Sequence, residues 1–141
     1  MSISVFILAF LLIMSLEANI DNRIFSPNIG IRFAFTDSEL QAGNTISTIY
    51  NERLGTDSYY GILFRYQLYS KYISIDNSLD TGDFRILSDL MIIIREETMN
   101  HPLSRPRQSP LTIKYNPFLI IEEQNFSRIY NCGSVSGYLK P

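Results

Sequence analysis

The first eighteen residues, MSISVFILAFLLIMSLEA, place the strongest constraint on this chain, because they belong either to its core or to no part of its folded body. From Ile3 to Leu16 every residue is apolar except two serines. A fourteen-residue helix rises about 21 Å, which is short of the roughly 30 Å hydrocarbon core of a bilayer. A short apolar run followed by the small residue Ala18 is typical of a signal peptide that is cleaved after residue 18.

Two alternatives stay open for this segment. No Lys or Arg precedes the apolar run, and Leu16 is large for its position before the cut, so a retained membrane anchor is one alternative and a buried core segment is the other. The first basic residue after the run is Arg23, so no cationic cluster holds the downstream chain in the cytoplasm. We therefore expect a secreted or membrane-associated protein whose body lies on the translocated side.

The charge balance argues against nucleic acid as a partner. The chain carries a net charge of −2, which provides no positive field for a polyanion. Residues 19–101 hold seven basic against eleven acidic residues, and residues 102–141 hold five against two. Any attraction to anions is therefore expected near the C-terminal end.

The chain has a single cysteine, Cys132, so no disulfide can form within it and packing alone must hold the fold. We expect Cys132 to be buried as a small apolar residue, and an intermolecular disulfide is the alternative.

Patterns in the body indicate strands more often than helices. Alternating apolar residues predict a strand over 28–36, and a longer strand or pair of strands over 58–75. Residues 45–55 favour a short helix that begins after Asn44 and ends at Gly55, whereas residues 76–83 are typical of a turn. Residues 84–99 fit a helix or strands, and the run MIII favours strands. Three further strands are expected at 111–115, 118–123 and 126–130, before a loose end over 131–141.

These elements predict a mostly β fold, either a small antiparallel sandwich or an open barrel, with one or two short helices and an N-terminal hydrophobic helix. The expected organisation is a signal peptide or anchor at 1–18, a β-rich body at 19–101, a Pro-rich loop at 102–110, and C-terminal strands with the tail of the same domain at 111–141.

The chain offers few residues for catalysis or metal binding. His101 is the one histidine and lies beside Pro102 in a loop, and no sequence context marks Cys132 as an activated nucleophile. Two such residues cannot form a zinc site, so we expect no catalytic residue, no metal and no cofactor. A cluster of aspartates fails the calcium-loop spacing and is expected to be a solvated turn: Asp76, Asp80, Asp83 and Asp89. A carboxylate-dependent enzyme is the third functional alternative, with four candidate residues: Glu96, Glu97, Glu122 and Glu123.

Aromatic and basic side chains are interleaved along residues 59–72, and basic residues recur in the Pro-rich loop. Such side chains suit a contact face for another protein, although plain packing of a sheet explains the tyrosines equally well. The candidate contact residues are Tyr59, Arg65, Tyr69, Lys71, Tyr72, Arg105 and Arg107. The leading hypothesis is a small exported or membrane-tethered protein that acts without catalysis through protein contacts. The alternative is a structural subunit of a larger membrane assembly, such as a viral envelope or organellar complex, with the first helix retained.

The triplet Asn125-Phe126-Ser127 is an acceptor sequence for N-linked glycosylation. It fits an exported chain, although such triplets also arise by chance.

Overall fold

A computed structural model of the protein describes residues 35–66, 68, 71–105 and 109–141. The predictions for residues 1–18 and for most of the strand at 28–36 lie outside these residues. The described elements, in chain order, are α2 (Asp37–Ile49), β1 (Leu54–Thr56), α3 (Ser58–Tyr66), β2 (Tyr72–Ser74), α4 (Asp76–Thr81), the 3₁₀ turn η1 (Arg85–Leu87), β3 (Met91–Arg95), α5 (Glu97–Asn100), α6 (Pro117–Glu123), β4 (Ser127–Asn131) and β5 (Val135–Leu139).

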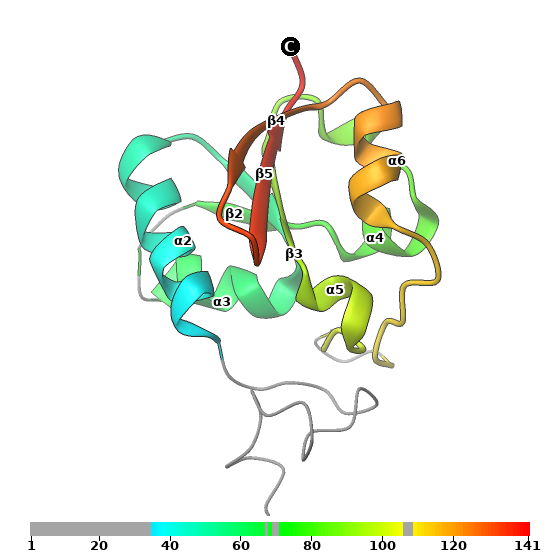
Figure 1. Ribbon diagram of the computed structural model, residues 1–141, viewed down its shortest axis with the longest axis horizontal. Helices are drawn as coiled ribbons and strands as arrows, with labels where there is room; N and C mark the ends of the chain where they lie inside the picture. Colours follow the sequence, from blue (N-terminus) through cyan, green and yellow to red (C-terminus); the bar gives the residue numbers. More distant parts are fainter. Residues whose placement is uncertain (1–34, 67, 69–70, 106–108) are drawn as a thin grey trace, which may run out of the picture.

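The mostly β prediction is wrong, because 42% of the described residues lie in helices and 23% in strands, around one mixed sheet. The five strands lie in the order β2-β1-β3-β5-β4 (Figure 1). Strands β2, β1 and β3 run parallel, whereas β5 is antiparallel to both β3 and β4. Helix α3 connects β1 to β2, and α4 with η1 connects β2 to β3, as parallel neighbours require. No described helix is both long enough and apolar enough to cross a bilayer.

Helices cover both faces of the sheet, so the domain has three layers. Side chains from α2 and α3 pack on one face with Met91 and Ile93 of β3. Side chains from α4 and α6 pack on the other face with Ile92 and Ile94. Every residue of β3 is buried, as expected of a central strand that is covered on both faces. The strand prediction for the MIII run is therefore confirmed, while η1 occupies the start of that segment.

The long strand predicted over residues 58–75 is wrong for its first half, which forms α3. Tyr60, Leu63 and Phe64 are buried on one side of this helix at spacings of three and four residues. Asp57 begins the helix, since its side chain accepts a hydrogen bond from the Tyr60 N–H at 2.9 Å. Within the predicted range, the structure has a strand only at β2, which is three residues long.

The helix predicted at 45–55 exists, but it begins earlier and ends earlier. A reciprocal capping box between Thr36 and Glu39 starts α2 at residue 37, and Gly55 belongs to β1. Residues 76–83 form α4 rather than a turn, and Gly82 ends that helix in the left-handed conformation with φ of 75°.

Three of the four C-terminal predictions are wrong. Residues 118–123 belong to α6, which begins at an Asn116 cap followed by Pro117, a pair that favours helix initiation. The expected loose end contains β5, whose residues 135–138 are buried between β3 and β4. Of the remaining two predicted strands, 126–130 is confirmed by β4, whereas 111–115 contributes only an isolated bridge between Leu103 and Leu111.

Candidate functional site

The carboxyl ends of the three parallel strands meet at one edge of the sheet, where open α/β sheets most often place a ligand. In the sheet, β2 lies on one side of β1 and β3 lies on the other side of β1. The strand order therefore reverses at β1. Asp57 follows β1, Ser74 ends β2 and Arg95 ends β3. This edge is therefore the first place to look for a site.

A buried ionic cluster of Glu39, Asp57 and Arg95 occupies that edge. The Arg95 guanidinium donates from Nε to Asp57 Oδ2 and from Nη2 to Asp57 Oδ1, both at 2.9 Å, and from Nη1 to Glu39 Oε1 at 3.2 Å. All three side chains are no more than 2% exposed. Burial opposes the positive charge, but the adjacent carboxylates outweigh burial and raise the pKa of Arg95.

Aromatic rings enclose the same guanidinium. The rings of Phe35, Tyr59 and Tyr60 lie 5.2 to 6.0 Å from the Arg95 Cζ, within the range of cation–π attraction. Burial, and then the charge of Glu39, raise the pKa of the Tyr60 phenol, which donates to the Glu39 carbonyl at 2.5 Å. The cluster thus joins α2, the start of α3 and the end of β3, and its three side chains are buried. We interpret it as a structural clamp.

A second polar group lies beside the clamp, at the ends of β1 and β2. The Ser58 hydroxyl donates to Asp76 Oδ2 at 2.5 Å, and the Ser58 N–H donates to Asp76 Oδ1 at 2.9 Å. The hydroxyls of Ser58 and Ser74 lie 2.9 Å apart. Asp76 is buried, so the prediction of a solvated turn is wrong for this member of the aspartate cluster. The carboxylate instead joins the first residue of α3 to the first residue of α4, which follows β2.

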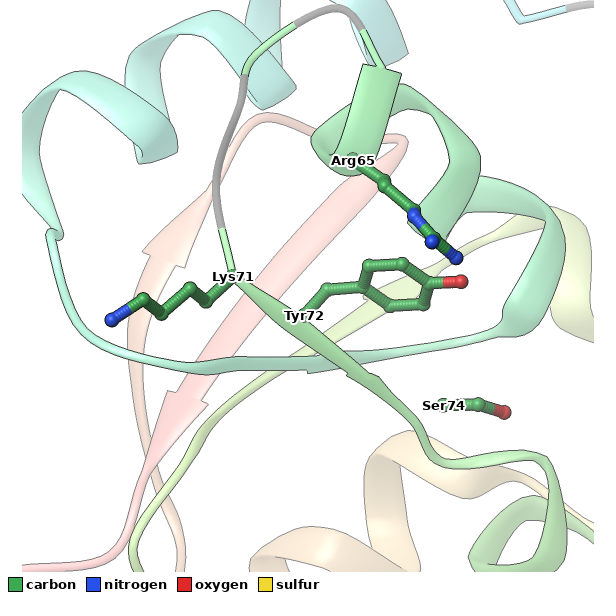
Figure 2. Close-up of a pocket in the computed structure, with 4 residues that line it drawn as sticks. All are labelled: Arg65, Lys71, Tyr72 and Ser74. Carbon is green, nitrogen blue, oxygen red and sulfur yellow. The ribbon is translucent and has the colours of Figure 1, made fainter.

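Within the described part of the chain, an open pocket of about 380 Å³ lies beside β2 and is lined by Arg65, Lys71, Tyr72 and Ser74 (Figure 2). The Tyr72 ring packs so closely on Gly61 of α3 that no Cβ would fit there. Arg65 is one helical turn after Gly61 and reaches toward that ring, whereas Lys71 points away from it at the start of β2. We call the four lining residues the β2 face. Three of them, Arg65, Lys71 and Tyr72, are predicted contact residues that the fold brings together.

The backbone of β2 is open on this side. The Leu54 N–H donates to the Lys71 carbonyl at 2.9 Å, and the Ile75 N–H donates to the Thr56 carbonyl at 3.0 Å. Because alternate residues of a strand direct their backbone groups to opposite sides, Tyr72 and Ser74 direct theirs away from β1. Among the described strands none pairs with that outer edge.

The other predicted contact residues lie elsewhere. Tyr59 packs against Phe35 over the clamp, with ring centroids 5.0 Å apart. Arg105 is bound to Asp80 at 3.3 Å and to the Ser109 carbonyl at 3.0 Å. Tyr69 and Arg107 lie outside the described residues.

The candidate chemical residues do not gather at one place. Cys132 is exposed in the turn between β4 and β5, so the prediction that it is buried is wrong. His101 is half-buried and lines a smaller pocket of about 220 Å³. The four candidate glutamates lie outside the β2 face, and Glu122 forms an ion pair with Arg128 at 2.5 Å. Within the described part of the chain, no three acidic, His or Cys side chains are placed to hold a metal ion.

The clamp is the feature that sequence reasoning missed. Glu39, Asp57 and Arg95 are distant in the sequence, and a local pattern marks only the caps at Thr36 and Asp57. Comparison with known proteins found no family model, no curated protein and no solved structure that matches this chain.

Proposed function

We propose that this protein is a non-enzymatic binding domain, and that its β2 face takes an extended acidic segment of another protein as an added strand. The observation that carries the proposal is the combination of an open strand edge with two cations beside it. Strand addition uses backbone hydrogen bonds for affinity and side-chain contacts for specificity.

Charge supports an acidic partner. Arg65 and Lys71 form no ion pair with any described residue, and both side chains are exposed. The surrounding chain over 19–101 is acidic in sum, so these two cations form a local exception. Complementary charge across an interface raises the association rate and selects against basic partners.

Exposed apolar side chains occur on α3 and β2, the elements that carry the β2 face. Ile62 and Tyr66 on α3 are 43% and 63% exposed, and Ile73 on β2 is 37% exposed. Aromatic and aliphatic side chains mixed with arginine are enriched in protein interfaces. An extended segment with alternating acidic and β-branched residues meets these requirements.

The first test uses two synthetic peptides, one that alternates Glu with Val and a matched one that alternates Lys with Val. Fluorescence anisotropy of labelled peptides is expected to show binding of the acidic peptide, weaker at high salt because added ions screen exposed charges. The double variant R65E/K71E is expected to lose at least about tenfold in affinity, which corresponds to about 1.4 kcal/mol of binding free energy. Reversal of an exposed lysine on another surface, K114E, serves as the control.

The second test separates backbone pairing from charge. Because the Ser74 N–H faces away from β1, S74P removes a donor from the open edge and leaves the β1 ladder intact. S74A is the matched control, since it removes the same hydroxyl and keeps the N–H. A loss of affinity in S74P beyond that of S74A supports strand addition. Equal affinities, or equal binding of both peptides, would refute the proposal.

The location of the protein is a separate proposal, based on the apolar first eighteen residues. We propose export, with the body on the translocated side. A mature chain that begins at Asn19 after expression in a secretory host supports cleavage of a signal. A full-length chain that resists alkaline extraction from membranes indicates a retained anchor, and a full-length chain in the cytosol refutes export.

A further inference from the structure

We propose that Asn125 carries an N-linked glycan, at the edge of the sheet opposite the β2 face. The acceptor triplet Asn125-Phe126-Ser127 is present once in the sequence. The fold places it where α6 ends and β4, the other edge strand, begins.

The three residues of the triplet divide between solvent and core as a modified site requires. Asn125 and Ser127 are exposed, whereas Phe126 between them is 3% exposed and packs in the core with Ile121 and Tyr138. The buried phenylalanine therefore holds the turn in place while the two polar side chains face solvent. A bulky sugar on Asn125 then has open space beside it.

The backbone at Asn125 explains why asparagine suits this position. Its φ of 66° is in the left-handed region, which asparagine enters more readily than most residues. The Asn125 N–H donates to the Glu122 carbonyl at 3.1 Å and closes the end of α6. The side-chain amide forms no hydrogen bond with a described residue, so a sugar on this amide would displace no contact of the fold.

The reaction is a transfer from an oligosaccharide carried on a lipid pyrophosphate. The Asn125 Nδ2 loses one proton and forms a bond to the anomeric carbon of the first sugar, while the bond from that carbon to the pyrophosphate breaks. The lipid pyrophosphate leaves with the electron pair. The hydroxyl at the third position of the triplet is required for recognition of the acceptor, which in this chain assigns that role to Ser127.

The test is expression of the full chain in an animal-cell secretory host, followed by treatment with a peptide N-glycosidase. A shift to lower apparent mass on treatment is expected for the native sequence. N125Q and S127A are expected to lose the shift, and S127T is expected to keep it because threonine also completes the triplet. The exposed Asn51 stands outside any such triplet, and N51Q is the matched control.

The proposal is overturned if the secreted or membrane-bound native chain has the unmodified mass, or if the chain stays unmodified in the cytosol. These results are independent of the peptide-binding tests, which can use protein made in bacteria without a glycan.

Discussion

The clamp of Glu39, Asp57 and Arg95 gives a quantitative prediction about stability. In the variant R95M, methionine occupies much of the arginine's volume, but two carboxylates remain buried without the cation that they contact at 2.9 to 3.2 Å. Removal of one partner from a buried ion pair costs about 3–5 kcal/mol. Domains of this size have total stabilities of about 5–15 kcal/mol, so we expect R95M to lose a large part of the folding free energy.

The comparison that tests the cause is the triple variant E39Q/D57N/R95M. The amides keep the oxygen acceptors that cap α2 and α3, and they remove the two buried negative charges. If uncompensated charge is the main cost, this variant recovers at least about 2 kcal/mol relative to R95M, because a buried charge network is often replaceable by neutral groups.

Urea unfolding followed by circular dichroism measures all three proteins at the same pH and salt concentration. Two results would refute the reasoning. One is a loss below about 1 kcal/mol in R95M, which would give the clamp the weight of an ordinary surface pair. The other is a triple variant that is no more stable than R95M, which would assign the loss to packing around the guanidinium rather than to charge.

Three further predictions concern single positions. G61A is expected to lower the urea midpoint, because a Cβ there meets the ring of Tyr72 on the adjacent strand, and it is expected to weaken acidic-peptide binding as that ring moves. Burial, and then the charge of Asp80, raise the pKa of Tyr115 to about 12, so its contribution to stability is present below pH 10 and is lost as the pH rises toward 12. The urea midpoint should therefore fall between pH 10 and pH 12, and it should fall less in Y115F. Cys132 is expected to react with a thiol reagent in the absence of urea at a rate near that of the unfolded chain, and slow reaction would contradict its exposure.

The sequence predicts the centre of the fold better than its class. The run MIII is apolar at consecutive positions, a pattern that favours a strand covered on both faces, and all five residues of β3 are buried. The same sequence does not indicate what covers the strand. Parallel pairing depends on helices between the strands, and α3 was mistaken for a strand because its aromatic and β-branched residues alternate over several positions.

Helix caps are the local signals that would have corrected the class. The pair Asp57-Ser58 before an apolar run, and Asn116-Pro117 before another, are start signals for helices. After the first of these caps, Tyr60, Leu63 and Phe64 have the spacing of a helix face. The same segment also has the alternation of a strand, so periodicity alone does not decide between them. Caps distinguish the two because only a helix begins with backbone N–H groups that need a partner.

The two sites differ in how far a sequence can reveal them. The interleaving of aromatic and basic residues over 59–72 predicts Arg65, Lys71 and Tyr72 as contact residues, and the fold brings them together through the contact of Tyr72 with Gly61. The clamp depends on contacts between distant residues: Arg95 is 38 positions from Asp57 and 56 positions from Glu39. No short window contains two members of the clamp, so a reading by pattern finds none of it.

The position of β5 has a consequence for how the chain folds during synthesis. This strand is the last of those described, yet it lies between β3 and β4 and contributes Val135 and Tyr138 to the two opposite cores. While residues 135–139 are still inside the ribosome, β3 has an unpaired edge and β4 has no neighbour. Contacts between segments so far apart close slowly, because the intervening loop must first be ordered. Nascent chains therefore leave one edge of the apolar strand β3 unpaired until residues 135–139 have left the ribosome, and fragments that stop before Val135 should need a chaperone to stay soluble.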